Sequence, residues 1–234
     1  MKMPDFHPWE VTPREAILIQ EDLRKKLVFQ SPAKPIRTFA AGDVSYGPGA
    51  DINFGAFLLF GYPDLVLLEA SGASGKISFP YIPGLLTFRE APVLLEAYSR
   101  LSRKPDLLLL DGQGAAHPRS MGIASHLGVL LNLPSIGCAK SRLCGEFEEP
   151  GSEKGSLAPL RYGEKTIGAA LRTRTGTRPV FVSPGHKMDL ATSASVVLSL
   201  CRTYRIPEPL RRAHAFVNRA REEFEASSFA KPSP

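Results

Sequence analysis

Three acidic residues, Asp43, Glu90 and Asp111, have the surroundings expected of a metal-dependent site. Asp43 lies near the end of an apolar stretch, Asp111 directly follows four leucines, and Glu90 closes the pattern Thr87-x-x-Glu90. If the two apolar stretches are neighbouring strands, both aspartates emerge at one edge of a sheet, where Glu90 can supply a third carboxylate. Clustered carboxylates repel one another, and hard oxygen ligands select Mg²⁺ or Mn²⁺. Two such ions roughly 4 Å apart can activate water and stabilise the leaving oxygen of a phosphodiester.

Each of these acids also has a simpler interpretation. Asp111 with Gly112 is a common way to end a strand in a turn. Glu90 can be the partner of Thr87 in a capping box that starts a helix. Asp43 is harder to explain without a partner, because an acid inside an apolar strand is costly unless it is paired or bound to metal. The order of the three along the chain favours the metal site.

Lys140 and His214 can assist such chemistry. Lys140 follows a short apolar strand and can stabilise a phosphate or orient water, although a solvated lysine is an equal alternative. His214 shares a helical face with Leu210 and Val217, so it is expected to point inward, either as a core histidine or as a group near a metal-bound water. Three other histidines are expected to be structural, with the first of them close to the site: His117, His126 and His186.

The segment Pro80-Tyr81-Ile82-Pro83 predicts a stiff aromatic loop beside these acids. Each proline fixes its own φ and restricts the residue before it. Gly112 and Gly114, just after the leucine run, permit close approach of backbone to a ligand and can let backbone amides contact a base. No phosphate-loop, dinucleotide-binding or G-x-S-x-G pattern is present.

The order of the expected strands and helices along the chain determines where the candidate site residues lie. We expect helices at residues 13–28, 87–101, 121–131, 190–201 and 207–224. We expect strands at residues 36–44, 53–62, 65–70, 107–110, 135–139, 166–172 and 180–183. The first three strands are joined by short turns, one of them at Gly47-Pro48-Gly49, which predicts an antiparallel meander. The leucine strand lacks alternation and should be buried on both faces.

This order predicts an α/β protein whose mixed central sheet, an antiparallel meander plus parallel strands, is flanked by helices. It matches the ribonuclease H-like arrangement, in which the first and fourth strands lie side by side. Residues 1–226 are expected to form a single domain, and residues 227–234 a disordered tail. Residues 145–156 are rich in Glu, Gly and Pro and are expected to form a surface loop.

The composition limits the functional class only loosely. The chain has 234 residues, and 29 Lys and Arg against 23 Asp and Glu give a net charge of +6. That charge fits a nucleic-acid partner, and it fits plain solubility as well. Three cysteines without a C-x-x-C pair favour a reducing cytosol over a disulfide framework or a zinc site. No signal peptide or membrane span is indicated, so we expect a cytoplasmic protein.

Several motifs together closely resemble the endonuclease V family. The motifs cover most of the chain: Gly42-Asp43-Val44-Ser45-Tyr46, the run from Pro80 to Glu90, Asp111-Gly112-Gln113-Gly114, Gly137-Cys138-Ala139-Lys140-Ser141, Val182-Ser183-Pro184-Gly185-His186 and Ile206-Pro207-Glu208-Pro209. Two positions depart from the family pattern. Gln113 stands where the family often has His or Asn, and the position of His214 varies within the family.

The resemblance implies a Mg²⁺-dependent endonuclease, with Mn²⁺ able to substitute, that acts on deoxyinosine and other deaminated or mismatched bases in DNA repair. It implies hydrolysis of the second phosphodiester 3′ to the lesion, leaving 3′-hydroxyl and 5′-phosphate ends. Asp43 and Asp111 would bind the metal and Glu90 would complete the acidic site. Lys140 and His214 would assist around the scissile phosphate.

The resemblance also assigns the lesion-binding residues. Pro80, Tyr81, Ile82 and Pro83 would form a wedge that fills the gap left by the displaced base, with Tyr81 stacking on the duplex. The base would enter a pocket lined by four residues and read largely by backbone groups: Leu86, Gly112, Gly114 and Ile123. Displacing a base costs a few kcal/mol, and less at a mismatch, which favours damaged sites.

Two alternatives remain open from the sequence. One is a nuclease of the same fold that prefers inosine in RNA, or branched and flap-like structures. The other is a binding module that has lost catalysis, which the presence of Asp43, Glu90, Asp111 and Lys140 argues against. In either case we expect a monomer without a membrane partner.

Overall fold

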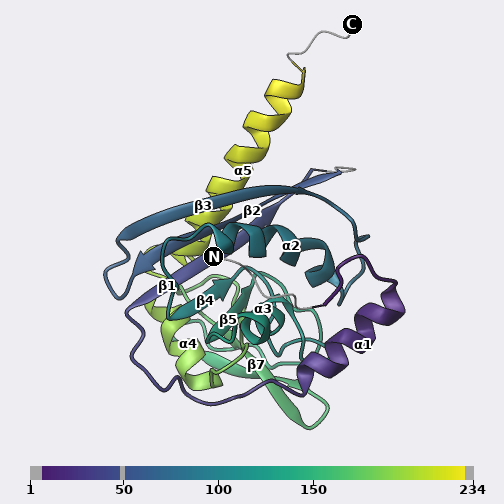
Figure 1. Ribbon diagram of the computed structural model, residues 1–234. Helices are drawn as coiled ribbons and strands as arrows, with labels where there is room; N and C mark the ends of the chain where they lie inside the picture. Colours follow the sequence, from purple (N-terminus) through teal and green to yellow (C-terminus); the bar gives the residue numbers. More distant parts are fainter. Residues whose placement is uncertain (1–6, 48–50, 230–234) are drawn as a thin grey trace, which may run out of the picture.

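The computed structural model describes residues 7–47 and 51–229, and its centre is one eight-stranded mixed sheet (Figure 1). The strands lie in the order β3-β2-β1-β4-β5-β8-β7-β6. Their bounds are β1 Thr38–Ser45, β2 Ile52–Gly61, β3 Leu67–Lys76, β4 Leu107–Leu110, β5 Ser135–Ala139, β6 Leu157–Tyr162, β7 Lys165–Leu171 and β8 Val180–Pro184. The helices are α1 Pro13–Arg24, α2 Leu86–Ser99, α3 Ile123–Leu131, α4 Leu190–Ser199 and α5 Glu208–Phe229.

The strand pairing confirms the predicted mixed sheet. β1, β2 and β3 form an antiparallel meander, and β1 pairs in parallel with β4, which pairs in parallel with β5. All four leucines of β4 are buried, as expected for a strand covered on both faces. The parallel register aligns Gly42 with Leu110, so Asp43, still within β1, and Asp111, just after β4, lie at the same end of the two strands.

Helices cover both faces of the sheet, and apolar residues alternate between them. Phe39, Leu107 and Leu109 face α4 and α5 in one core cluster. Ala40 and Leu108, their neighbours along the strands, face α2 and α3 in the other. Because successive strand residues point to opposite faces, the continuous apolar runs of β1 and β4 satisfy both layers.

The sequence-based bounds were wrong at several places. β6 was not predicted; it contains Pro159, which is tolerated because β6 is an edge strand of the sheet. α1 ends at Arg24, before the predicted 28, because the chain turns away and the Val28 carbonyl accepts a hydrogen bond from the Lys187 amide. β3 extends to Lys76. The expected turn at 47–49 runs into residues 48–50, which lie outside the described residues.

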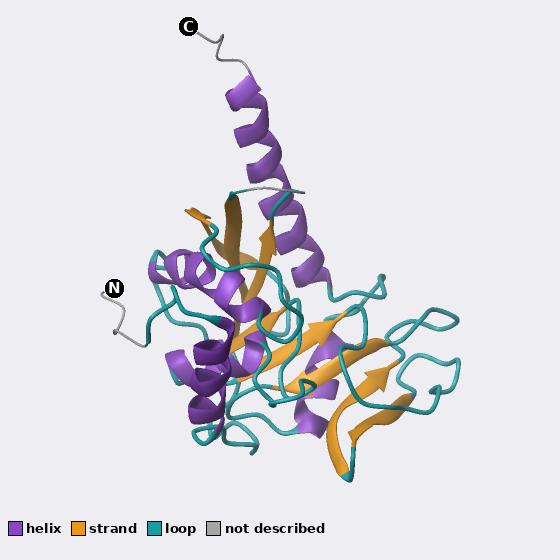
Figure 2. Ribbon diagram, turned by 90° about the vertical axis from the view of Figure 1, so that its right-hand side faces the viewer, coloured by secondary structure: helices purple, strands orange, loops and turns teal. Residues whose placement is uncertain are grey.

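α5 is longer than predicted and extends well beyond the sheet (Figure 2). It ends at Phe229, so residues 227–229 of the expected tail are helical, and residues 230–234 lie outside the described part of the chain. Its first turns pack Leu210, Ala213 and Val217 against the sheet. Within residues 7–47 and 51–229, none of the helices combines the length and the apolar character that crossing a bilayer requires.

Candidate active site

Asp43, Asp111 and His214 come together at one edge of the sheet. One ligand atom from each lies within 4.8 Å of those of the other two, and this is the single such group of three found among the described residues. Asp43 is on β1, Asp111 follows β4, and His214 is on the second turn of α5. The parallel pairing of β1 with β4 therefore builds the aspartate pair, and the packing of α5 on the sheet adds the imidazole.

Asp43 is buried, and its carboxylate is held from two sides. Its Oδ1 accepts the backbone N–H of Val44 at 2.8 Å, and its Oδ2 lies 2.7 Å from Nδ1 of His214. Burial, reinforced by the nearby charge of Asp111, raises the pKa of Asp43. A buried acid crowded by a second, partly buried acid is a donor set that suits a hard divalent cation, because a cation would offset both the desolvation of Asp43 and the repulsion between the two carboxylates.

His214 does not lie in the core, and the expectation that it points inward was wrong. Its side chain is 51% exposed, and only the edge that carries Nδ1 turns toward Asp43. The helical face shared with Leu210 and Val217 is buried, but His214 sits at its border, where the sheet ends. It therefore belongs to the rim of the acidic site.

Glu90 faces the same site from α2, and it does not cap that helix. Leu85 is the N-cap residue and makes no side-chain capping bond, so Thr87 lies inside the first turn. The capping-box interpretation was wrong. Glu90 is buried, and burial together with the charge of Asp43 raises its pKa to about 8. Glu90 is not part of the group formed by Asp43, Asp111 and His214. The negative charges of both aspartates nevertheless act on Glu90 and contribute to its raised pKa.

Lys140 reaches the site from the end of β5. Its Nζ lies 2.6 Å from Oδ2 of Asp111, with nearly half of the lysine side chain exposed. β5 is parallel to β4, so the residues after both strands again meet at one edge. Arg205 donates to the Lys140 carbonyl at 2.8 Å and to the carbonyl of Pro179, which fixes the backbone from which Lys140 extends.

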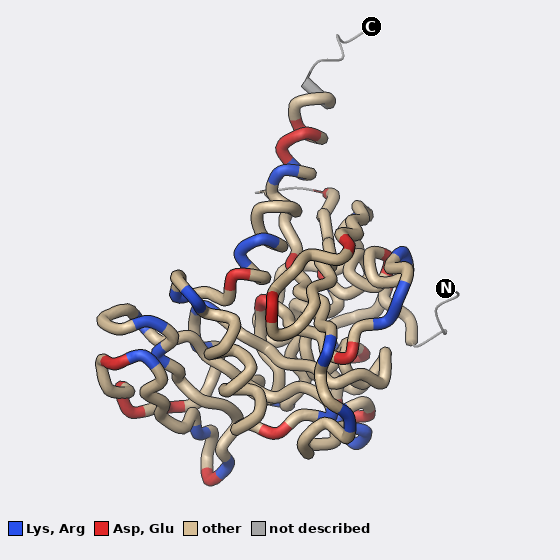
Figure 3. Tube along the Cα trace, turned by 90° about the vertical axis from the view of Figure 1, so that its left-hand side faces the viewer, with Lys and Arg blue, Asp and Glu red and all other residues tan. Residues whose placement is uncertain are grey.

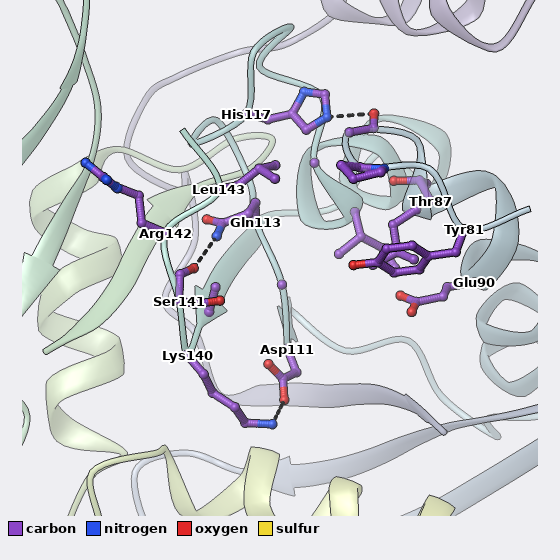
Figure 4. Close-up of a pocket in the computed structure, with 17 residues that line it drawn as sticks. Tyr81, Thr87, Glu90, Asp111, Gln113, His117, Lys140, Ser141, Arg142 and Leu143 are labelled. Carbon is purple, nitrogen blue, oxygen red and sulfur yellow. Dashed lines mark hydrogen bonds and ion pairs between the residues drawn. The ribbon is translucent and has the colours of Figure 1, made fainter. Parts of the chain in front are cut away.

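A pocket of about 300 Å³ opens beside these charges (Figure 4). Asp111, Lys140 and Glu90 line its charged end, and Tyr81 and Leu143 line it from opposite sides. Five of the predicted lesion-binding residues line this pocket: Tyr81, Pro83, Leu86, Gly112 and Ile123. Tyr81 is 64% exposed, and its ring points into the pocket.

The other three predicted lesion-binding residues do not line it. Ile82 is half-buried and packs against the apolar cluster around Phe79, and Pro80 is exposed outside the pocket. Gly114 lies behind the pocket, where its N–H donates to Oγ of Ser183 at 2.8 Å. A side chain there would lie 2.4 Å from the carbonyl oxygen of Pro184, so this glycine serves close packing and its amide is already bonded.

Sequence reasoning missed Arg142 and Leu143, which line the pocket from the loop after β5. The available signal was their place in the sequence, two and three residues after Lys140. Among the histidines, His117 is buried and lines the pocket, as its closeness to Asp111 suggested. His126 is fully buried with its Nε2 2.8 Å from that of His7, and His186 is buried, so neither takes part in the acidic group.

Charge is distributed unevenly along α5, the helix that carries His214 (Figure 3). Its basic residues occur from the first turns onward, and its far end is acidic. The basic residues are Arg211, Arg212, Arg219 and Arg221; the acidic ones are Glu208 at the start of the helix and Glu222, Glu223 and Glu225 near its far end. Arg219 and Arg221 form ion pairs with Glu223 and Glu225 one turn further along the helix.

Comparison with known proteins agrees with this arrangement. The family model described as Endonuclease V matches residues 21–215. An endonuclease V from Dehalococcoides mccartyi is 47% identical over 214 residues, which cover 92% of this chain and 96% of that relative. The crystal structure of endonuclease V from Streptomyces avermitilis is 41% identical, with a TM-score of 0.89 over 95% of this chain and 98% of that one.

A further solved structure adds a nucleic acid. Endonuclease V from Ciona intestinalis, in complex with a 24mer DNA containing an inosine followed by a ribo-adenosine, is 27% identical, with a TM-score of 0.80. It covers 90% of this chain and 98% of its own. The family model spans the positions of Asp43, Glu90 and Asp111, and the match to the Dehalococcoides relative covers 92% of this chain. The chain therefore belongs to the endonuclease V family.

Proposed function

We propose that this protein is a divalent-metal-dependent endonuclease that recognises deoxyinosine in DNA and hydrolyses the second phosphodiester on the 3′ side of the lesion. The observation that carries the proposal is the pocket of about 300 Å³ that has Tyr81 at one side and Asp111, Glu90 and Lys140 at its charged end. A pocket for a displaced base thus lies next to groups suited to phosphodiester hydrolysis. The inosine-containing DNA bound by the Ciona relative supports the choice of base.

Asp43 and Asp111 would hold the ion, with Glu90 and His214 beside them. Mg²⁺, or Mn²⁺ in its place, would supply an activated water and neutralise charge on the phosphate. Asp43 must be ionised to act as a ligand, and Nδ1 of His214 lies 2.7 Å from its Oδ2, within hydrogen-bonding distance of the carboxylate. Lys140 contributes a positive charge at the same edge, where negative charge develops on the phosphate during cleavage.

The pocket suits a flat base with few polar contacts of its own. Leu86 and Ile123 supply apolar surface to the pocket. Gly112 has no side chain, so its backbone would lie close to a base bound between them. Tyr81 is the exposed aromatic group that can stack where the base has left the duplex. Pro80 and Ile82 act from outside the pocket, the first as a stiff contact with DNA and the second by packing the loop onto the protein.

A strand-labelled duplex with one deoxyinosine, incubated with Mg²⁺, tests the proposal. We expect a single cut at the second phosphodiester 3′ to the lesion, with 3′-hydroxyl and 5′-phosphate ends. Asp43→Ala and Asp111→Ala should abolish the cut while DNA binding persists. Matched duplexes with deoxyadenosine, deoxyuridine or a simple mismatch define the range of lesions. Cutting without regard to the lesion, or no cutting with Mg²⁺ or Mn²⁺, would remove the proposal.

Inosine in RNA is a second candidate substrate, because the Ciona complex carries a ribo-adenosine after the inosine. Repeating the assay with ribose at the lesion and at its 3′ neighbour separates the two. We further propose that the protein acts as a monomer in DNA repair in a reducing cytosol. The three free cysteines, Cys138, Cys144 and Cys201, support that compartment. Gel filtration with and without DNA tests the monomer.

A further inference from the structure

The carbonyl oxygen of Gly84 accepts hydrogen bonds from three side chains that lie far from it in the sequence. Nε2 of His117 lies at 2.8 Å, Nη2 of Arg119 at 2.9 Å and Nε2 of Gln20 at 3.1 Å. Gly84 directly follows the loop that carries Tyr81. A carbonyl oxygen has two lone pairs, so three donors exceed its usual number of partners. The backbone at Gly84 is therefore held to the rest of the protein by three side chains.

The donors are also bonded to one another, which closes the network. Gln20 is fully buried; its Oε1 accepts from Nε of Arg119 at 2.7 Å, and its Nε2 also reaches the Met121 carbonyl at 3.2 Å. Every hydrogen-bonding atom of the Gln20 amide is therefore used. A fully satisfied buried network of this kind rigidifies its members.

His117 is held as a neutral donor within the same network. Its Nδ1 faces the backbone N–H groups of Arg119 at 3.1 Å and Met121 at 3.3 Å, so Nδ1 accepts and the proton is on Nε2. Burial lowers the pKa of His117 to about 4, which agrees with a neutral ring at physiological pH. The bond from Nε2 to Gly84, visible at the upper edge of Figure 4, therefore has a fixed direction.

Gly84 itself is adapted to this attachment. Its φ of +81° is left-handed, and a Cβ there would lie 3.2 Å from Nη2 of Arg119, so glycine fits both the conformation and the space. On its other side the loop packs Phe79 and Leu85 against Ala16 of α1. α1 thus holds the Tyr81 loop by an apolar contact through Ala16 and a polar one through Gln20.

From this network we infer that Gln20 and Arg119 are positioning residues, which hold the Tyr81 loop rigid while it displaces a base from a duplex. The inference rests on the proposed function. Opening a base pair costs a few kcal/mol. A loosely held loop would change its own conformation before it displaced the base from the duplex. A base in single-stranded DNA needs no displacement, so the network should matter for duplex substrates and little for single strands.

The test compares cleavage of deoxyinosine in duplex and single-stranded DNA by Gln20→Met, which keeps the size of the side chain and removes its hydrogen bonds. We expect the duplex rate to fall between roughly tenfold and a hundredfold, and the single-strand rate to stay within about twofold. Arg119→Lys keeps the charge and loses the paired geometry, so it should show the same selective loss. Ser71→Ala is the matched control, because its buried hydroxyl bonds the Ala97 carbonyl at the other end of α2.

A second measurement follows base displacement without catalysis. With 2-aminopurine beside the lesion and no divalent ion, fluorescence should rise on binding of the wild type and much less on binding of Gln20→Met. Equal losses on both substrates would assign Gln20 to general stability, and unchanged rates would overturn the inference as well. If the wild type cuts neither substrate, the proposed function falls, and the fluorescence comparison decides the inference alone.

Discussion

The buried carboxyl of Glu90 should make the metal-free protein less stable, so Glu90→Gln should stabilise it in the absence of divalent ions. Glu90 is buried on α2, close to Asp43, and these surroundings raise its pKa from about 4.5 to about 8. Between those two pH values the folded protein holds a proton that the unfolded chain releases. Stability therefore falls as pH rises through this window. Glutamine is neutral in both states and escapes the penalty.

The size of the effect follows from the pKa shift. Each pH unit inside the window is worth about 1.4 kcal/mol, so the penalty on Glu90 is about 1 kcal/mol at pH 5.5 and about 4 kcal/mol at pH 7.5. The difference of about 3 kcal/mol corresponds to roughly 6 to 12 °C in the melting temperature of a domain of this size. The advantage of Glu90→Gln over the wild type should grow by that amount between the two pH values.

Thermal unfolding in excess EDTA at pH 5.5 and pH 7.5 measures this directly. Glu96→Gln is the matched control, because it makes the same change on an exposed turn of the same helix, where Glu96 pairs with Arg100. The control should shift the melting temperature little, and equally at both pH values. If the gain of Glu90→Gln does not grow with pH, then Glu90 does not titrate as a buried acid and the electrostatic description of the site is wrong.

Three further predictions concern other parts of the molecule. Tyr81→Ala should weaken binding to a deoxyinosine duplex by roughly 1–3 kcal/mol through lost stacking, and unchanged binding in a fluorescence titration would remove its assigned role. Mg²⁺ or Mn²⁺ should raise the melting temperature of the wild type and not that of Asp43→Asn; a rise in both would place the ion elsewhere. Thr12→Ala should cost about 1 kcal/mol in urea unfolding, because Thr12 caps α1 through the Glu15 amide at 3.3 Å; no loss would make that capping bond dispensable.

The elements that position the acids were predictable because their signals are local. Four leucines bounded by polar residues identify β4, and an apolar run that ends in an acid identifies β1. Thr12 and Glu15 form a capping box at the start of α1 with both of its reciprocal bonds, and the signal for it lies within four consecutive residues. The parallel pairing of β1 with β4 followed from the order of the elements, and it placed Asp43 beside Asp111.

The surroundings of the acids were less predictable, because they depend on contacts between distant segments. The border position of His214 is set by where α5 crosses the sheet, which no periodicity within α5 encodes. The pattern Thr87-x-x-Glu90 is a valid capping signal, but the N-cap residue is Leu85, two residues earlier. Glu90 is instead buried beside Asp43, so its side chain is not used for capping. The Gly84 attachment needs α1 and the loop at Arg119 to meet, so single-sequence patterns cannot show it.

The start of α2 links the two halves of the proposed reaction. Leu86 and Glu90 are four residues apart, so they lie on the same face of the helix with a rise of about 6 Å between them. Both line the same pocket, the first at its apolar part and the second at its charged end. A base held against Leu86 and an ion held near Glu90 would therefore be tied to one rigid helical turn. The hydrogen bonds to Gly84 also fix the chain just before that turn. Few flexible segments would therefore separate the recognised base from the bond that is cut, which favours cleavage at one defined phosphodiester.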